Sequence, residues 1–322
     1  MARHPPRAVI ARTIRLPAGL LPGTLLRVPA SPRFARLLAC TVASAALGLT
    51  GCDSAPSGAG PTSASPDQGA GCARPTVRDD ADLVAALRSA RPGDRIVLAP
   101  GRYRPISIER AGRRGAPITL CGPRTAVVRG RSVAHGYAVH LDGASHWRLS
   151  GFSVEGGQKG VVLDASDEVV LRGLRVTDTG DEAVHLRTGS SGVRVIGTTI
   201  RRTGLRMPAF GEGIYVGSAQ SNWCALTACR PDRSDHAVLL GNDIAATTAE
   251  AIDVKEGTTG CLIRGNRLAV ATDAVVDSVV DLKGDRCRMV GNRVRARPGV
   301  VAVRVLTVRP GWGEDNVVRG GR

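Results

Sequence analysis

Aromatic residues are scarce in this sequence: it has three Trp, three Tyr and three Phe among 322 residues. This scarcity argues against a single-strand nucleic-acid binder, which places aromatic side chains between basic ones. Glycine, by contrast, occurs 40 times, and Val and Ile are frequent. The composition favours short stacked strands with tight turns over a helical bundle.

Acidic residues are missing from the first 51 positions, which contain seven arginines. Residues 37–50 form an uncharged run that is too short for a typical transmembrane helix and fits an export signal. The run ends in Leu49-Thr50-Gly51-Cys52, which resembles the bacterial lipobox; ordinary secretory cleavage nearby is the alternative. We therefore expect a signal peptide with an N-terminal extension (1–51), a lipidated Cys52 with a Ser/Pro/Gly linker (52–71), and export to the cell surface.

No cysteine pair has the C-x-x-C spacing of a zinc site. Outside the signal and the lipidation position, six cysteines remain, an even set that indicates disulfides in an exported protein. We expect the pairs Cys72–Cys121, Cys224–Cys229 and Cys261–Cys287.

The formal net charge is +16, and +9 remains after the signal is removed. The basic residues are almost all arginine and are spread along the chain. A positive surface attracts polyanions, so the expected partner is an acidic extracellular polysaccharide, not nucleic acid. The membrane is expected to be reached only through the lipid anchor, and the protein to be a monomer.

A glycine-centred repeat runs through the domain at 72–322. Six segments share the pattern apolar–x–Gly–x–x–apolar, with glycines spaced by 22, 24, 44, 24 and 26 residues: Gly151, Gly173, Gly197, Gly241, Gly265 and Gly291. This period predicts an all-β, single-stranded parallel β-helix, because the Leu/Asn frame of leucine-rich repeats is missing. The long interval fits one coil plus an insertion at 218–236. Residues 79–90 read as a short helix that caps the N-terminal end.

A second strand in each coil places polar residues in register: EAVHLR (182–187), EGIYVG (212–217), EAIDVK (250–255) and SVVDLK (278–283). Because side chains alternate between the faces of a strand, two outward columns are expected. One contains His185, Tyr215, Asp253 and Asp281. The other contains Arg187, Gly217, Lys255 and Lys283, and Glu182, Glu212 and Glu250 precede three of the strands.

These columns have two interpretations. A ladder of surface ion pairs contributes only about 0–1 kcal/mol per pair. Yet like charges stacked on neighbouring strands oppose stability, and they shift lysine pKa values down and carboxylate pKa values up, as in a tuned catalytic base. We favour the functional interpretation.

The chemistry that these residues predict on an acidic polysaccharide is β-elimination. Lys255, with Lys283 as substitute, is the candidate base for the C5 proton. Arg187 or the other lysine is the candidate for binding the uronate carboxylate, and Tyr215 or His185 for protonating the leaving oxygen.

Four acidic residues offer the oxygen ligands that Ca²⁺ prefers: Glu212, Glu250, Asp253 and Asp281. Asp253 and Asp281 are also candidates for substrate binding, with Trp223 and Trp312 as aromatic platforms for sugar rings. The competing chemistry is glycoside hydrolysis, because the expected spacing of Asp253 and Asp281 is close to that of retaining enzymes.

Several segments resemble the pectate-lyase-like superfamily of secreted right-handed parallel β-helix proteins. The start, DLVAALRSARPGDRIVLAPGRY followed by GAPITL, is similar to the N-terminal motif of alginate lyases and chondroitinase B-type enzymes. The resemblance covers about residues 75–318 and implies a polysaccharide lyase with a Lys or Arg base, a role that maps onto Lys255, and commonly Ca²⁺ at the uronate. A non-catalytic polysaccharide-binding lipoprotein and a β-helix hydrolase or C5-epimerase remain alternatives, since this fold hosts all of them.

Overall fold

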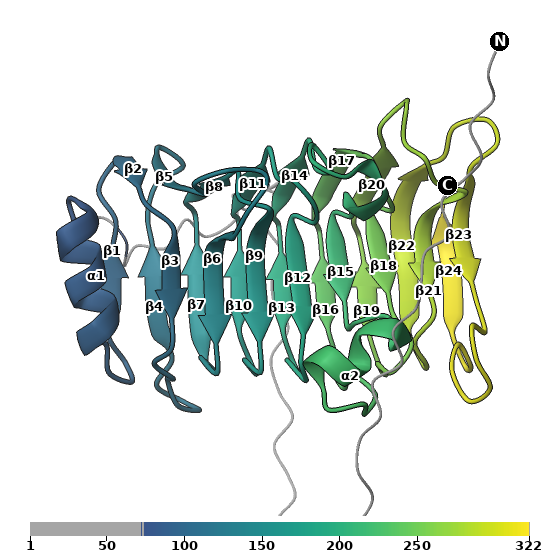
Figure 1. The fold of residues 1–322 in the computed structure, drawn as a ribbon, viewed down its shortest axis with the longest axis horizontal. Helices are drawn as coiled ribbons and strands as arrows, with labels where there is room; N and C mark the ends of the chain where they lie inside the picture. Colours follow the sequence, from purple (N-terminus) through teal and green to yellow (C-terminus); the bar gives the residue numbers. More distant parts are fainter. Residues whose placement is uncertain (1–71, 73, 322) are drawn as a thin grey trace, which may run out of the picture. The chain divides into compact units, whose positions relative to one another are not determined.

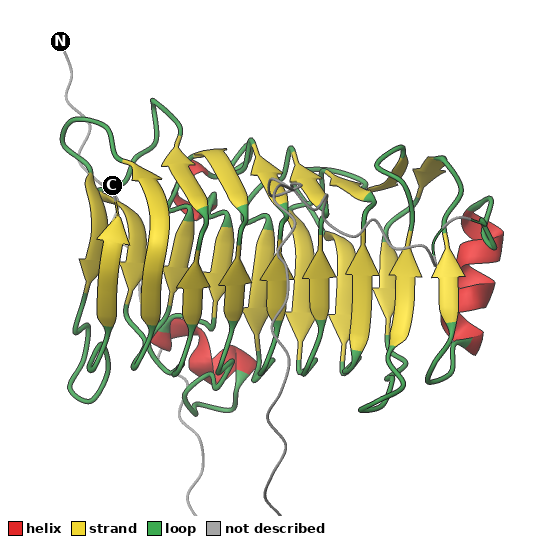
Figure 2. Cartoon of the chain, turned by 180° about the vertical axis from the view of Figure 1, so that it is seen from behind, coloured by secondary structure: helices red, strands yellow, loops and turns green. Residues whose placement is uncertain are grey.

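The computed structural model describes Cys72 and residues 74–321. Almost all of this part is short parallel strands stacked in a β-helix, as the repeat predicts, and each coil contributes one strand to each of three faces (Figures 1 and 2). The predicted signal and lipidation at Cys52 lie outside the described residues. None of the helices in the described part is long and apolar enough to cross a membrane.

The first face begins each coil. Its strands are β1 (Arg95–Val97), β4 (Ile118–Cys121), β7 (Trp147–Ser150), β10 (Val170–Arg172), β13 (Arg194–Ile196), β16 (Val238–Leu240), β19 (Leu262–Arg264), the start of β22 (Arg288–Arg295) and β24 (Val317–Gly321).

The second face follows after a sharp corner. Its strands are β2 (Gly101–Tyr103), β5 (Ala126–Arg129), β8 (Ser153–Glu155), β11 (Arg175–Thr177), β14 (Thr199–Arg201), β17 (Asp243–Thr247), β20 (Arg267–Val270) and the end of β22. The repeated glycine of the sequence motif lies at this corner. Gly197 and Gly241, for example, have φ values of +59° and +61°, a left-handed conformation that glycine adopts without steric cost.

The third face is an eight-stranded sheet that completes each coil. Its strands are β3 (Ile106–Ile108), β6 (Tyr137–Asp142), β9 (Lys159–Asp164), β12 (Val184–Arg187), β15 (Ile214–Val216), β18 (Ile252–Val254), β21 (Ser278–Leu282) and β23 (Val301–Val305).

The core lies inside the coils and is built from stacked aliphatic side chains. On the third face, Val184, Ile214, Ile252 and Val280 pair in register and are fully buried. A buried asparagine ladder adds polar order at the corner between the first two faces. The Oδ1 atom of Asn266 accepts from the backbone and side chain of Asn242, and Asn292 does the same for Asn266. Each buried amide is thereby satisfied, which favours one alignment of successive coils.

The N-terminal end is covered by helix α1 (Asp80–Ser89), which buries Leu83 and Leu87 (Figure 2). Asp79 caps the helix by accepting a hydrogen bond from the Asp82 amide at 2.9 Å. The predicted capping helix is therefore present.

Two insertions leave the coils on either side of the third face. The shorter one, residues 202–211, contains the 3-10 helix η1 (Pro208–Phe210) and leads into β15. The longer one, residues 218–236, contains η2 (Gln220–Asn222) and α2 (Trp223–Leu226). The structure contains the three disulfides expected from the sequence: Cys72–Cys121, Cys224–Cys229 inside the longer insertion, and Cys261–Cys287 between coils.

Candidate active site on the third face

The register of the third face aligns the predicted polar column. His185 pairs with Tyr215, Tyr215 with Asp253, and Asp253 with Asp281 on four successive strands. The expectation that this column is exposed is wrong. His185, Tyr215, Asp253 and Asp281 are only 5%, 8%, 2% and 4% exposed.

The insertions help to explain this burial, because they pack at opposite ends of the third-face strands. At one end, the backbone of Arg206 bonds to Gly180 and the carbonyl of Pro208 accepts from Thr248. At the other end, Asp232 accepts from the Thr188 amide and Glu256 accepts from the Gln220 amide. The strand pattern alone does not reveal these flanking loops.

Asp253 is the centre of a compact ionic cluster. Its carboxylate lies 2.9 Å from the Nζ of Lys255 and 2.9 Å from the Nζ of Lys283. Lys283 also binds Asp281 at 2.9 Å. The charges therefore alternate in the order Lys255, Asp253, Lys283, Asp281. Lys283 bridges the two carboxylates, which were predicted to stack on neighbouring strands.

This bridging changes the expected role of Lys283. Burial alone lowers the pKa of a lysine, but the facing carboxylates of Asp253 and Asp281 raise the pKa of Lys283 well above its usual range. The prediction of a lowered lysine pKa is wrong for this residue. Lys283 stays protonated and is a poor base, whereas Lys255 has one carboxylate partner.

Tyr215 lies between His185 and Lys255. The His185 and Tyr215 rings meet edge to face with centroids 4.6 Å apart, and the Nζ of Lys255 lies 5.1 Å from the Tyr215 ring centroid. Burial, together with Asp253 and Glu212, raises the pKa of Tyr215 well above 10. The phenol is therefore a stable proton carrier at neutral pH.

His185 is tied to its surroundings. Its Nε2 lies 3.0 Å from the carbonyl of Gly217, which can only accept, so Nε2 carries a proton directed at that oxygen. Its Nδ1 lies 3.4 Å from Glu182. Because both ring nitrogens face protein groups, Tyr215 is the better placed of the two predicted proton donors.

Arg187 belongs to a separate cluster on the N-terminal side. Its guanidinium donates twice to Asp164, at 2.7 and 3.0 Å, and once to the Tyr137 hydroxyl at 2.9 Å. His140 approaches the same carboxylate at 2.8 Å. These bonds lower the pKa of Asp164 against the opposing effect of burial, and they place Arg187 away from the Asp253 cluster.

Sequence reasoning missed Tyr137, His140 and Asp164. A signal was present, because the letters AVHL occur both at 138–141 and at 183–186. The strand pattern that defined the column therefore extends two coils toward the N-terminus, through β6 and β9.

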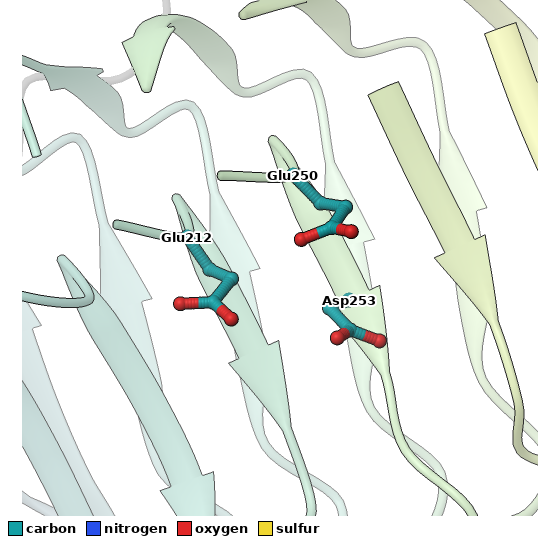
Figure 3. Close-up of side chains that lie close together, drawn as sticks. All are labelled: Glu212, Glu250 and Asp253. Carbon is teal, nitrogen blue, oxygen red and sulfur yellow. The ribbon is translucent and has the colours of Figure 1, made fainter. Parts of the chain in front are cut away.

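Three acidic residues approach one another at the start of β15 and on β18. Single carboxylate oxygens of Glu212, Glu250 and Asp253 all lie within 4.8 Å of one another (Figure 3). Glu212 is 6% exposed, and its buried Oε2 has no hydrogen-bond partner among the described residues. Burial and the neighbouring carboxylates raise its pKa well above 4.5, and the pKa of Glu250 is also raised.

A second acidic group shares Glu250 and adds Asp277 and Asp281. A pocket of about 620 Å³ lies beside it, lined by Glu250, Asp277 and Arg297 among others. Glu182 differs from Glu212: burial alone would raise its pKa, but its contacts with His185 and Lys159 lower the pKa to about 2.

The carboxylate oxygens of Glu212, Glu250 and Asp253 are suitable ligands for a divalent cation. Glu212 presents a buried oxygen with no partner in the described part of the chain, and carboxylates are ligands that Ca²⁺ accepts. Both Asp253 oxygens already accept from Lys283. Glu212 and Glu250 are therefore the residues whose charge most needs a cation or a proton.

Neither predicted tryptophan is an open platform for a sugar ring. Trp223 is 4% exposed, and its indole donates to the Ser218 carbonyl at 2.9 Å. The Arg309 guanidinium lies 5.6 Å from its ring centroid. Trp312 is half-buried, with Arg233 5.6 Å from its ring centroid.

No family profile matches the chain, and no curated protein matches it. Among solved structures, the chain is similar to an alginate lyase from Paenibacillus sp. str. FPU-7, with 32% identity and a TM-score of 0.71 over 76% of this chain and 85% of that one. It also resembles pectate lyase Pel9A, with 14% identity and a TM-score of 0.53 over 69% and 62% of the two chains, a likeness of fold.

The sequence repeat, the coils with three faces and the similarity to the alginate lyase all indicate the same superfamily. The chain belongs to the pectate-lyase-like superfamily of right-handed parallel β-helix proteins.

Proposed function

We propose that the protein is a polysaccharide lyase that cleaves uronate-containing chains by β-elimination. The observation that carries the proposal is the position of Lys255, whose Nζ lies 5.1 Å from the Tyr215 ring centroid and beside the acidic group of Glu212 and Glu250. The 32% identity to an alginate lyase supports the same reaction class. Export and anchoring through Cys52 are part of the proposal.

The reaction needs a base and an acid in sequence. The amine of Lys255 takes the C5 proton of the uronate. As the C–H electron pair forms the C4=C5 double bond, the C4–O bond breaks with its electron pair on the leaving oxygen, and the Tyr215 hydroxyl donates a proton to that oxygen. The raised pKa of Tyr215 keeps the phenol protonated until this step.

The C5 proton becomes acidic only when the uronate carboxylate is neutralised. Glu212 and Glu250, with Asp253, would hold a Ca²⁺ ion, which supplies positive charge to that carboxylate when bound. Without an ion, the raised pKa of Glu212 favours a neutral carboxyl that donates a hydrogen bond to the same group.

Lys283 completes the site as a positioning residue. It remains charged and holds Asp253 and Asp281 at 2.9 Å. Asp253 in turn holds Lys255. The same contacts disfavour retaining hydrolysis by Asp253 and Asp281, because the Nζ of Lys283 already lies 2.9 Å from both carboxylates.

Incubation of residues 72–322 with alginate, pectate, glucuronan and glycosaminoglycans, with and without Ca²⁺, tests the proposal. We expect an unsaturated product with ultraviolet absorbance from at least one polymer. Folded protein that binds a polymer without product would identify a binding module, and saturated products would indicate a hydrolase. A C5-epimerase would change the sugar composition without cleaving the chain.

A further inference from the structure

A second pocket lies on the N-terminal coils, at the corner between the second and third faces. Its volume is about 680 Å³. It extends past the ends of five successive strands, β2, β5, β8, β11 and β14, which follow one another along one edge of the molecule (Figure 1). Its lining residues are Asp80, Arg102, Tyr103, Arg104, Pro105, Arg129, Gly130, Arg131, Ser132, Val133, Glu155, Gly156, Asp178 and Leu205. None of them belongs to the proposed reaction centre.

Three arginines of this pocket, Arg102, Arg129 and Arg131, are weakly engaged by the protein, whereas a fourth, Arg104, lies 3.2 Å from Asp80. Arg102 and Arg129 are 66% and 56% exposed and lie 3.7 and 3.9 Å from Glu155, distances typical of loose surface pairs. Arg131 makes no ion pair or side-chain hydrogen bond with the described residues. Arg187 contrasts with them, because two hydrogen bonds already fix its guanidinium on Asp164. The pocket arginines therefore keep donors for a ligand.

Apolar side chains form part of the same pocket. Leu205 is 53% exposed and Val133 is 37% exposed, so the pocket has an apolar wall beside its arginines. A pocket that combines an apolar wall with a few cationic donors fits a ligand with apolar faces and anionic substituents. A chain of uronate rings has this character.

Residues of the pocket wall, or their chain neighbours, contact residues next to the start of the third-face strand β12. Leu205 lines the pocket, and the next residue, Arg206, binds Asp181, which precedes Glu182 at the start of the reactive face. The Val133 carbonyl lies against Gly180, where an added Cβ would be only 1.8 Å from it. The coil of Arg129 and Arg131 and the coil of Tyr215 are three steps apart, or about 14 Å at roughly 4.8 Å per coil.

We infer that this arginine pocket, formed by Arg102, Arg129, Arg131, Val133 and Leu205, binds a second stretch of the acidic polysaccharide while another stretch lies at Lys255. The guanidinium groups bind uronate carboxylates with paired hydrogen bonds. The polymer then extends from the reaction centre along the coil axis toward α1. This inference rests on the proposed function for its substrate class.

The test is a triple variant, Arg102→Ala with Arg129→Ala and Arg131→Ala. Electrophoresis through gels containing alginate or pectate should show about tenfold weaker retardation than for the natural protein, because several charge-assisted contacts are lost. Retardation of the natural protein should weaken with added salt. In cleavage assays, KM for the polymer should rise about tenfold relative to KM for short oligosaccharides, which do not reach the pocket.

A matched control removes three other exposed arginines from nearby coils. Arg148, Arg172 and Arg194 lie on β7, β10 and β13 of the first face and are exposed. Their replacement by Ala changes the net charge equally, and we expect retardation and KM to stay close to those of the natural protein. Equal losses in both triple variants would overturn the inference, as would no loss in the pocket variant.

The two proposals fail separately. If no polymer is cleaved but the pocket variant alone loses retardation, the lyase reaction is wrong and the arginine pocket stands. If the polymer is cleaved and the pocket variant matches the natural protein in both assays, the pocket is wrong and the lyase stands.

Discussion

Two clusters on the third face each contain a largely buried carboxylate and reach opposite electrostatic states. Around Asp164, Arg187, His140 and Thr188 all donate to one carboxylate, and its pKa falls. Around Glu212, the partners are other carboxylates, and its pKa rises. The charge of the first carboxylate is compensated, whereas the second is an uncompensated group that a ligand or proton can satisfy. We propose that charge compensation, and not residue type, separates structural from reactive positions here.

The largest expected effect is on turnover at Lys255. Lys255→Ala should lower the rate on a uronate polymer by about 10²–10⁴-fold, the contribution of a general base. Binding of the polymer should persist. Thermal unfolding should change little, because Lys283 still compensates Asp253.

Lys283→Ala is the variant to compare with Lys255→Ala, because both lysines bind Asp253. It leaves the buried Asp281 without its cation and Asp253 with Lys255 alone, so we expect a loss of stability of about 3 kcal/mol. If Lys255→Ala unfolds as easily as Lys283→Ala, the division between reactive and structural lysine is wrong.

The Asp164 cluster should show its role in stability. Asp164→Asn removes the charge facing the buried Arg187 and should lower the free energy of unfolding by about 3 kcal/mol, as measured by urea denaturation. An effect near zero would mean that this cluster is not structural.

The two tyrosines of the face offer a pair of matched changes. Tyr215→Phe removes the proposed proton donor and should lower turnover by about 10²-fold. Tyr137→Phe removes only a hydrogen bond to Arg187 and should affect turnover by less than about threefold. Equal effects of the two changes would contradict the assignment of Tyr215 as the acid.

The smallest effect concerns Glu212 and pH. Because folding raises the pKa of Glu212, the folded protein binds more protons than the unfolded one above about pH 4.5, and stability falls as pH rises. Glu212→Gln removes this dependence and should be about 1 kcal/mol more stable than the natural protein at neutral pH. The contribution of Asp164 to stability depends on pH in the opposite direction. Because folding lowers its pKa, this contribution is lost as the pH drops below about 3.8.

A bound cation would stabilise the natural protein but not the Glu212→Gln variant. Ca²⁺ should raise the unfolding temperature of the natural protein and not that of Glu212→Gln, and chelation should lower turnover only in the natural protein. A natural protein that responds to neither treatment would leave the neutral carboxyl of Glu212 as the group that faces the uronate.

Much of the architecture was predictable because it repeats. The glycine period defined the coil, and the alternation in EAVHLR, EGIYVG, EAIDVK and SVVDLK predicted a register that the structure confirms. The six cysteines also pair as expected.

The burial of the polar column on the third face, and the contacts that each of its side chains makes, could not be predicted from the repeat. Burial of Asp253 depends on lysines that fold back onto it, and burial of Trp223 depends on an insertion with no counterpart in the other coils. Such contacts have no period in the sequence. The Asp164 cluster was not predicted although its strands carry the pattern, because the predicted column began at β12, two coils after β6.

The two ends of the β-helix differ in how far their apolar side chains are covered. Helix α1 covers the first coil, but at the other end Val301, Val305 and Val318 are 50%, 48% and 42% exposed on the last strands. A duplicated coil appended there would find aliphatic neighbours already in place. Such a coil would cover apolar side chains that are exposed in this structure, and it would leave Tyr215 and Lys255 untouched.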